Sequence, residues 1–449
     1  MRPARRWCAA AALAGALLVG GAPGGVRAER DLSPIDLVDL EVSYDTLTTQ
    51  YYRHVDPQRL IDGARVGIVA YLRGCGIEDP SVPTLRANGR YAHDLHVAGQ
   101  EVAQALVRYG TRIDPHELVY GAIDGEASAL RDPYTVFFTA DQERQFQKFL
   151  NPQSFGGIGV IIGVDRSSGR LSIDQVIPGG PGDKGGLLPG DWILAIDGVP
   201  VQGVATETLE GRLRGKAGTV VGLTYGRGTA SSVTVRLVRA SVTPPDVFSR
   251  MLPGGIGYVQ LTSYGSNAPG EMHAQLRRLE SQDARAYVLD LRDNGGGYRD
   301  AAVAITSEFV PHGPIMVVQA RNGKRTTTES VRARVVTKPL AVLVNGNTAS
   351  GAEITAGAIQ DLSAGLLVGT RTFGKGLVQA MYPLPDGAAL KVTVERYYTA
   401  RGRDIDRKGI DPDLTVEQPA GSVAGDPARD PQLASALGLL ATRLASPTP

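Results

Sequence analysis

A serine and a lysine occur in this chain at a spacing suited to nucleophilic catalysis. Ser350 lies in the run NGNTASGAE, directly after the apolar stretch LAVLVN, and Lys375 follows 25 residues later in TFGKGLVQ. A serine hydroxyl needs a base, and a lysine serves as one near neutral pH only when burial disfavours its ammonium form. The pair predicts a serine nucleophile activated by lysine; the alternative is an ordinary helix cap at Ser350 and a solvated Lys375.

The segments between these residues are expected to bring them together. A helix over 351–362 retreats roughly 18 Å, and a strand over 366–371 returns roughly 20 Å. In a right-handed strand–helix–strand unit, both side chains then lie outside the carboxyl ends of neighbouring parallel strands. Gln379, four residues beyond Lys375, shares a face with it in an extended segment and is expected to hydrogen-bond the amine.

A glycine-rich stretch supplies candidate groups for stabilising an oxyanion. The strand-like run ARAYVLD (284–290) leads into LRDNGGGYRDA, which contains Gly295, Gly296 and Gly297. Consecutive glycines permit a tight turn and close approach of backbone N–H groups to a ligand. One amide, of Gly296 or Gly297, together with the Gly351 amide at a helix start predicts a two-donor oxyanion hole. A plain turn is the alternative.

Four segments together resemble one family, the carboxyl-terminal processing peptidases, also called tail-specific proteases. They are DLRDNGGG, the Ser350 run with EITAGAIQD behind it, GTRTFGKGLVQ, and YYTARGRDIDRKGIDPD. The resemblance implies that Ser350 is the nucleophile, Lys375 the general base and Gln379 the residue that orients the lysine. It adds Asp361 as a possible member of a charge relay, although eleven helical residues separate it from Ser350 by roughly 16 Å. It also implies a crotonase-like α/β core, a mostly parallel sheet with helices, and no metal or nucleotide cofactor.

The sequence departs from the family's common pattern at both loops. Thr348, Gly351 and Ala352 replace the residues usual around the nucleophile, and Gly295 stands where the family commonly has proline. Gly351 still supplies its amide. Neither departure removes a reacting group.

An upstream region resembles a PDZ domain. It begins with FGGIGVIIG (155–163) and continues through LLPGDWILAIDG, although Gly182, Gly185 and Gly186 replace residues more often proline or alanine. Such a domain adds an extended peptide to its sheet edge and captures the terminal carboxylate with backbone amides. The resemblance implies that the following residues bind the peptide: Gly157, Ile158 and Gly159 through the loop, and Val160 and Ile162 through an apolar pocket.

The order of these parts predicts a serine endopeptidase that holds unstructured, apolar C-terminal tails of protein substrates and cleaves near them. The competing class is a catalytically inactive peptidase-like scaffold that only binds C-termini, and a third possibility is an enzyme held latent until a tail or partner binds. A trypsin-like Ser-His-Asp protease with a C-terminal PDZ domain is disfavoured. No histidine sits in a comparable motif, and the PDZ-like part precedes Ser350.

The first 28 residues read as a secretory signal peptide. Arg2, Arg5 and Arg6 precede an apolar stretch, and residues 26–28 form an acceptable cleavage site. The protein is therefore expected in the periplasm or outside the cell; an uncleaved membrane anchor is the alternative. Cleavage would leave 43 basic against 46 acidic residues and Cys75 as the sole cysteine. Nothing in this balance suggests nucleic acid binding, and no internal disulfide is possible.

Residues 29–147 read as a helical region with an internal repeat, used for packing or self-association into a homo-oligomer. VDPQRLIDGA (55–64) and IDPHELVYGA (113–122) match with an offset of 58 residues, each with an Asp cap before a Pro. We hypothesise a duplicated helical unit. His93 and His96 could share a helical face, but a metal site is disfavoured because a third ligand is lacking.

The remaining boundaries follow from strand and turn signals. The PDZ-like domain is expected over 148–242 and the catalytic domain over 243–418, followed by a C-terminal linker and helix over 419–449. The catalytic sheet is expected to run through GGIGYVQLTSYG, PIMVVQAR, PLAVLVN, LLVGT and ALKVTVERYYT.

Overall fold

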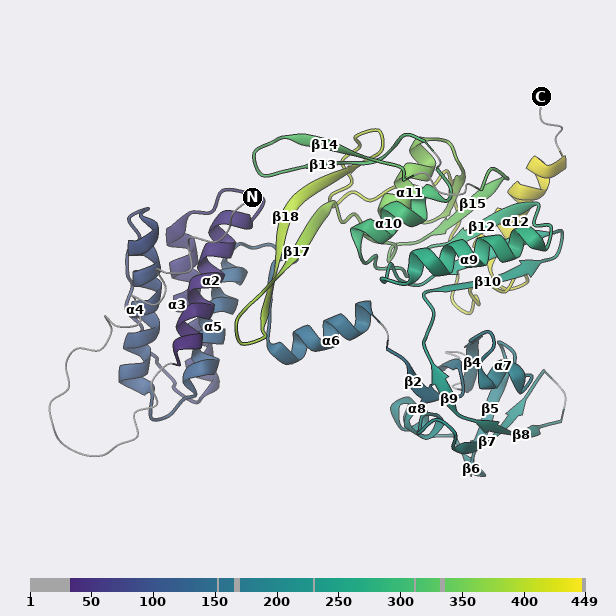
Figure 1. Ribbon diagram of the computed structural model, residues 1–449, viewed down its shortest axis with the longest axis horizontal. Helices are drawn as coiled ribbons and strands as arrows, with labels where there is room; N and C mark the ends of the chain where they lie inside the picture. Colours follow the sequence, from purple (N-terminus) through teal and green to yellow (C-terminus); the bar gives the residue numbers. More distant parts are fainter. Residues whose placement is uncertain are drawn as a thin grey trace. The chain divides into compact units, whose positions relative to one another are not determined.

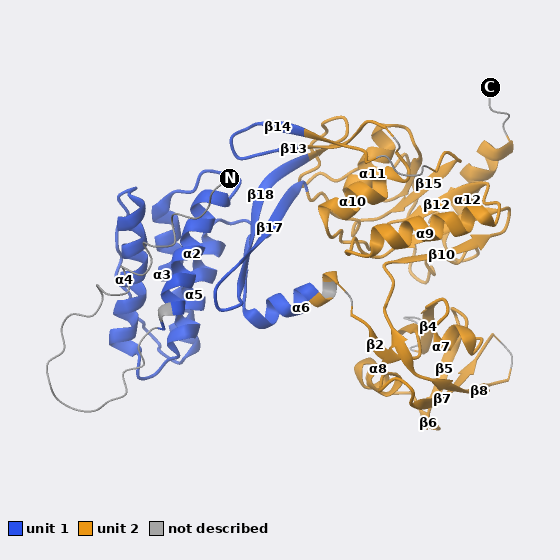
Figure 2. Ribbon diagram, viewed as in Figure 1, with its two compact units in different colours: residues 1–147, 318–326, 376–397 blue, residues 148–317, 327–375, 398–449 orange. Residues whose placement is uncertain are grey.

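A computed structural model of the 449-residue chain describes residues 33–151, 153–164, 170–228, 231–310, 312–331 and 336–445. The expected signal peptide, and with it the membrane-anchor alternative, lies outside these residues. The chain forms two compact units (Figure 1, Figure 2). Unit 1 comprises residues 1–147, 318–326 and 376–397; unit 2 comprises residues 148–317, 327–375 and 398–449.

Four helices build most of unit 1, and the two repeated stretches begin two of them. The Asp56 carboxylate accepts the N–H of Gln58 at 3.1 Å, and the Asp114 carboxylate accepts the N–H of His116 at 2.9 Å. Each cap is followed by a proline, whose fixed φ suits the first helical position. The two repeated stretches therefore form the same element, the capped start of a helix, and the duplicated helical unit stays a hypothesis. The helices are α2 (Pro34–Gln50), α3 (Pro57–Gly74), α4 (Tyr91–Tyr109) and α5 (Pro115–Ala129).

Glycines let α3 and α5 approach until their backbones touch. A Cβ on Gly67 would lie 1.9 Å from the carbonyl oxygen of Gly121, and one on Gly125 would lie 2.2 Å from that of Gly63. Gly63 and Gly121 occupy equivalent positions of the repeat, as do Gly67 and Gly125. Each helix thus meets its own counterpart in the antiparallel sense, around an approximate two-fold axis.

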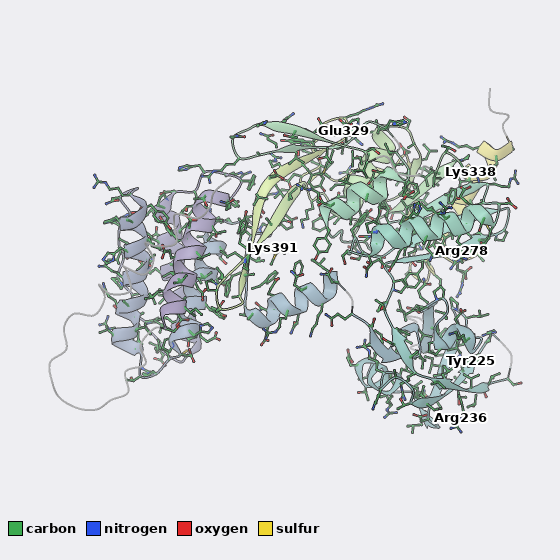
Figure 3. The ribbon with its side chains drawn as sticks, in the orientation of Figure 1. Tyr225, Arg236, Arg278, Glu329, Lys338 and Lys391 are labelled. Carbon is green, nitrogen blue, oxygen red and sulfur yellow. The ribbon has the colours of Figure 1, made fainter. Side chains whose placement is uncertain are left out.

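A short strand, most of a connecting helix, a hairpin and residues 318–326 complete unit 1. Lys391 on β18, labelled in Figure 3, is near two aromatic rings. It lies 5.2 Å from the ring centroid of Phe138 and 5.3 Å from that of Phe146. Burial lowers the pKa of Lys391, and the two rings interact favourably with its cationic form. This contact joins the hairpin to the helix that leads toward the PDZ-like region. The elements are β1 (Val136–Phe138), α6 (Ala140–Leu150), β17 (Leu377–Pro383) and β18 (Ala389–Thr399).

The PDZ-like region of unit 2 is a small β domain with its own apolar core. One sheet has the strand order β3-β4-β5-β7-β8, with β6 paired to β5, and β2 pairs with β9 in a second sheet. The core contains Ile173, Ile193, Val221 and Leu223, all nearly inaccessible to solvent. The elements are β2 (Phe155–Gly157), β3 (Val160–Val164), β4 (Leu171–Val176), α7 (Pro181–Lys184), β5 (Trp192–Ile196), β6 (Val199–Pro200), α8 (Thr206–Leu213), β7 (Val220–Gly226), β8 (Val233–Val238) and β9 (Ala240–Val242).

The rest of unit 2 is built on a six-stranded sheet in the order β10-β11-β12-β15-β16-β19. Strands β10 and β11 pair antiparallel, and every later pair is parallel. The strands are β10 (Val247–Leu252), β11 (Ile256–Leu261), β12 (Ala286–Asp290), β15 (Leu340–Val344), β16 (Leu366–Gly369) and β19 (Leu414–Thr415). Four helices accompany them: α9 (Ala268–Ser281), α10 (Arg299–Ser307), α11 (Gly351–Asp361) and α12 (Pro431–Ala445).

Helices cover both faces of this sheet. Leu433, Ala436 and Leu440 of α12 pack against one face, in a cluster with Val288 and Leu343. Tyr287 alternates with Val288 and so points to the other face, where its hydroxyl donates to Glu280 of α9. The C-terminal helix is therefore an integral layer of this domain and not an appendage of a linker.

Two segments expected in this sheet belong elsewhere. Residues 314–319 and 389–399 form β13 (Pro314–Gln319) and β18 of a five-stranded sheet in the order β1-β18-β13-β14, with β17 paired to β18 and β14 at Arg325–Glu329. Their apolar, β-branched residues indicate strands but carry no information about which strand each one joins. Pairing with its hairpin neighbour β17 and with β1, a strand distant in the chain, determines the place of β18.

Within the described part of the chain, no helix combines the length and the apolar composition that crossing a membrane requires.

The glycine contact between α3 and α5 predicts a large penalty for one added methyl group. Gly67→Ala is expected to lower the free energy of unfolding by about 1–3 kcal/mol, because backbone atoms cannot yield as a side chain can. Gly99→Ala on α4 is the matched control, since a Cβ there meets nothing within 4 Å; it should stabilise by about 0.5–1 kcal/mol through helix propensity. Denaturant unfolding of the full chain measures both. Equal stability of the two variants would show that the close approach is wrong.

Candidate active site

Three loops at the carboxyl ends of neighbouring parallel strands hold the candidate catalytic residues. The glycine run 295–297 follows β12, Ser350 follows β15, and Lys375 follows β16. Helix α11 and strand β16 begin where expected. The helix ends one residue earlier than expected and the strand two residues earlier. Ser350 and Lys375 consequently lie at the same edge of one sheet within unit 2.

Ser350 has a backbone conformation that is unusual for a residue with a side chain. Its φ is 56° and its ψ is −116°, and it stands immediately before the first residue of α11. Holding a non-glycine residue in such a region costs about 1–3 kcal/mol and is found mainly at functional sites. A sharp strand-to-helix turn also presents the side chain next to the free N–H groups and positive end of the helix.

A buried carboxylate ties the serine turn to the lysine loop. Glu353, with no solvent exposure, accepts the N–H of Ser350 at 3.0 Å on one oxygen, which also accepts the N–H of Lys375 at 2.9 Å. Its other oxygen accepts the N–H of Gly374 at 2.7 Å and the hydroxyl of Thr372 at 2.5 Å. Burial raises the pKa of Glu353, and the four donors oppose that rise. The backbones of Ser350 and Lys375 are thus joined through a single oxygen atom.

The glycine loop lies directly against Ser350. A Cβ on Gly296, whose φ is +94°, would lie 2.8 Å from the Ser350 Cβ and 2.7 Å from the Gly351 nitrogen, so only glycine fits there. The fully buried Asn294 side chain accepts the Gly296 N–H at 2.8 Å and donates to the Leu261 carbonyl at 2.7 Å. The Gly296 amide is therefore already engaged.

The lysine loop is braced by the segment 405–410, which belongs to one of the motifs that suggested the family. The N–H of Ile410 donates to the Thr372 hydroxyl at 2.8 Å, and the N–H of Thr372 donates to the Ile410 carbonyl at 3.1 Å. The N–H of Arg407 donates to the Gly374 carbonyl at 2.7 Å. Thr372 and Gly374, which precede Lys375, are thus hydrogen-bonded to the segment 405–410.

Two further candidates have partners of their own. Gln379 lies on β17 in unit 1, next to a bulge between Val378 and Gln379, and its side-chain amide donates to the Thr393 hydroxyl at 3.4 Å. Because the bulge interrupts the alternation of faces, the expected sharing of a face with Lys375 does not follow from spacing. Asp361 ends α11, where its carboxylate accepts the N–H of Arg401 at 2.7 Å and pairs with Arg403 at 2.5 Å. Roles in catalysis for both stay predictions.

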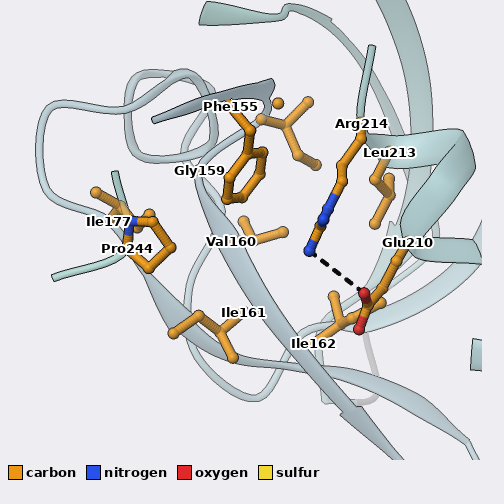
Figure 4. A pocket seen from close by; sticks show the side chains of 12 residues that line it. Phe155, Gly159, Val160, Ile161, Ile162, Ile177, Glu210, Leu213, Arg214 and Pro244 are labelled. Carbon is orange, nitrogen blue, oxygen red and sulfur yellow. Dashed lines mark hydrogen bonds and ion pairs between the residues drawn. The ribbon is translucent and has the colours of Figure 1, made fainter. Parts of the chain in front are cut away.

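A separate pocket lies in the PDZ-like domain, beside strand β3 and the end of helix α8 (Figure 4). Its volume is about 150 Å³, and its lining includes all five residues expected to bind a peptide: Gly157, Ile158, Gly159, Val160 and Ile162. Strand β3 pairs with β4 and is at the edge of its sheet. The carbonyls of Ile158 and Gly159 accept hydrogen bonds from Gly182 at 2.6 Å and Ile177 at 2.9 Å, which fix the loop's orientation.

One charged pair stands at the mouth of this apolar pocket. The Arg214 guanidinium lies 4.4 Å from the ring centroid of Phe155, and it pairs with Glu210 at 3.4 Å (Figure 4). Leu213 contributes apolar lining from the same helix end. The pocket thus combines an apolar interior, backbone amides at a strand start and one ion pair.

The residues that position the two loops were not singled out in the sequence. Glu353 stands three residues after Ser350, and S-x-x-E before a helix is the signature of a capping box, so a signal for it existed. Thr372 carries no comparable signal, because its partners Glu353 and Ile410 are distant in the chain. Asn294 belongs to the motif DLRDNGGG, but its bond to the Leu261 carbonyl is defined by the fold.

Comparisons with known families agree with the arrangement of these parts. Residues 255–416 match peptidase family S41, and residues 172–226 match the PDZ domain.

Curated relatives cover most of the chain. The carboxy-terminal processing protease CtpA of Bacillus subtilis is 36% identical over 312 residues, covering 69% of this chain and 66% of the relative. A carboxyl-terminal-processing protease of Picosynechococcus is 36% identical over 326 residues, covering 72% of this chain and 78% of the relative. Among solved structures, the photosystem II D1 C-terminal processing protease is 27% identical with a TM-score of 0.46, covering 86% of this chain and 94% of that one.

Proposed function

Because this chain belongs to the carboxyl-terminal processing proteases of peptidase family S41, we propose that Ser350 and Lys375 form the Ser-Lys dyad of this serine endopeptidase. The observation that carries the proposal is the Glu353 carboxylate, which holds the backbones of both residues through one oxygen atom. A fixed spacing between nucleophile and base is what general-base activation of a hydroxyl requires.

The reaction follows from the roles of the two side chains. The uncharged Lys375 amine takes the proton of the Ser350 hydroxyl as its oxygen attacks the scissile carbonyl carbon. The tetrahedral intermediate then expels the amino end of the downstream peptide, which receives that proton from the Lys375 ammonium. An acyl-serine remains. Water attacks the acyl carbon while Lys375 takes a water proton, and that proton returns to Ser350 as the new carboxyl end is released.

Backbone amides stabilise the oxyanion in this scheme. We assign the Gly351 N–H as one donor, because the first residue of a helix has no acceptor inside that helix. The second donor is Gly297 in preference to Gly296, whose N–H is bonded to Asn294. Preorganised donors of this kind act where charge develops and need no reorganisation during the reaction.

The PDZ-like pocket selects the substrate by its tail. An extended C-terminal segment adds to the open edge of β3, with its carboxylate at the amides of Gly157, Ile158 and Gly159. Val160 and Ile162 then surround an apolar last side chain, in keeping with the apolar lining of the pocket. Proteins with unstructured, apolar C-termini are therefore the proposed substrates.

Three finer assignments complete the proposal. Export through the N-terminal 28 residues would place the enzyme in the periplasm or outside the cell. Gln379 orients the Lys375 amine, and Asp361 contributes at most indirectly through its pair with Arg403. The mostly parallel, helix-covered sheet is consistent with a crotonase-like core.

Replacing either member of the dyad is expected to abolish cleavage. Ser350→Ala and Lys375→Ala should each lower kcat by roughly 10³-fold or more while leaving thermal unfolding unchanged. Lys324→Ala is the matched control, since this lysine is exposed in the turn between β13 and β14. Cleavage of an unfolded, apolar-tailed protein is measured by mass spectrometry of the products. Wild-type turnover by the Lys375 variant would reject the assigned base.

Removing the charge of Glu353 is expected to loosen the dyad. In Glu353→Gln the side-chain NH₂ would face N–H donors instead of accepting from them, and those hydrogen bonds would be lost. The spacing of Ser350 and Lys375 would loosen, so kcat should fall roughly 10- to 100-fold with KM little changed. The free energy of unfolding should fall by about 1–3 kcal/mol for the same reason. Glu417→Gln, at an exposed position, serves as control. A Glu353→Gln enzyme with wild-type kcat would contradict the constraint.

Recognition of the tail is expected to depend on a free carboxylate and on Val160. Amidating the C-terminus of a peptide substrate should raise KM about tenfold, since charge-assisted hydrogen bonds contribute about 1.5–3 kcal/mol. Val160→Lys should do the same, whereas Val238→Lys should not, because Val238 is 55% exposed on another strand of this domain. Steady-state kinetics on the free and amidated peptides decide the matter. Equal KM values would remove the role given to this pocket.

A further inference from the structure

A buried cluster of one arginine and two aspartates joins distant parts of unit 2. Arg292 donates to both oxygens of Asp290, from Nε at 2.9 Å and from a terminal nitrogen at 2.5 Å. It also donates to both oxygens of Asp430, at 3.0 and 2.8 Å. All three residues are at least nine-tenths buried. Arg292 thus makes a two-pronged pair on each side, the strongest arrangement open to a guanidinium.

Asp430 has a second role at the start of α12. Its carboxylate accepts the N–H of Leu433 at 3.1 Å and the N–H of Gly425 at 2.7 Å, which caps the helix and closes the preceding loop. Gln432 in the first turn gives Arg292 another acceptor at 3.0 Å. Because α12 packs on the sheet through Leu433 and Leu440, Asp430 is held rigidly. The arginine is consequently fastened to a layer of the core.

The other side of the cluster leads to the oxyanion loop. Arg292 follows β12 by two residues, and two residues later the side chain of Asn294 holds the Gly296 N–H at 2.8 Å. The Asn294 carbonyl accepts the N–H of Ala349, the residue before Ser350, at 2.9 Å. The guanidinium therefore anchors the point at which the chain enters the glycine loop.

We propose that Asp430 is a positioning residue for the reaction, acting through Arg292 on the glycine loop that stabilises the oxyanion. This inference rests on the proposed function and extends it to the C-terminal helix. Without Asp430, Arg292 keeps the Asp290 carboxylate and the Gln432 oxygen as acceptors but loses its second carboxylate. A buried guanidinium that loses hydrogen bonds shifts toward the partners that remain. Arg292 would then shift together with the backbone it carries, and oxyanion donors tolerate only small displacements. Substrate binding at the distant PDZ pocket is unaffected in this scheme.

Two variants separate the ion pair from the helix cap. Asp430→Asn and Asp430→Ser both retain a good capping residue, but neither can pair with Arg292 through two carboxylate oxygens. Each is expected to lower kcat roughly 10-fold or more, with KM within about twofold of the wild-type value. Leu440→Ala is the matched control, because it removes a buried α12 side chain and leaves the cluster intact; its kcat should stay near the wild-type value.

The comparison is made on the full chain with a peptide that carries a free apolar tail, and Ser350→Ala is measured in parallel. Wild-type protein no more active than Ser350→Ala means that the proposed function fails. If the wild type is active and the folded Asp430 variants keep its kcat, the inference is overturned. The same holds if their kcat falls no further than that of Leu440→Ala. Should neither Asp430 variant fold, Gln432→Met removes one acceptor of Arg292 and keeps both carboxylates. A threefold or greater fall in its kcat supports the inference, and an unchanged kcat overturns it.

Discussion

One buried carboxylate constrains the candidate catalytic centre. Glu353 lies in the first turn of α11, yet three of its four donors come from the loop after a different strand. A buried carboxylate is stable only while both of its oxygen atoms accept hydrogen bonds, because burial without hydrogen bonds disfavours the charged form. The loop that carries Lys375 must therefore adopt the one path that supplies those donors. One Glu353 oxygen accepts the N–H groups of both Ser350 and Lys375, so it also holds the strained turn at Ser350 in place.

The rest of the catalytic domain continues this arrangement. Loops converge at the carboxyl edge of the sheet, while α12 covers one face through apolar contacts and α9 lies on the other, where Glu280 accepts the Tyr287 hydroxyl. Each loop at this edge has its own internal anchor: Asn294 for the glycines, Glu353 for the serine and lysine, and Thr372 for the segment 405–410. The fold therefore fixes each loop through buried hydrogen bonds.

Much of this site could be predicted from the sequence, because strand and helix lengths measure distance along the chain. The span of α11 followed by β16 brings Lys375 back to the edge where Ser350 lies, within two residues of the expected ends. The Asp-Pro starts of α3 and α5 were readable for a similar local reason. The glycines after β12 also follow the apolar run 284–290, which indicates a buried strand.

Interactions between distant segments were not readable in this way. Arg292 and Asp430 are separated by 138 positions, and no local pattern indicates that they meet. The partners of β13 and β18 were assigned wrongly, because an alternating apolar run indicates a strand without identifying its neighbours. The bulge beside Gln379 is likewise invisible in composition, although it decides which way that side chain faces.

The repeated helices of unit 1 bear on how that unit assembles. A single helical hairpin with a face of glycines could cover that face only by binding a second polypeptide. The fraction of hairpins that are paired would then depend on protein concentration. Here Gly63 and Gly67 meet Gly121 and Gly125 of the same chain. Assembly of the four helices is therefore a first-order event, insensitive to dilution, and each molecule carries its own complement however few copies are present.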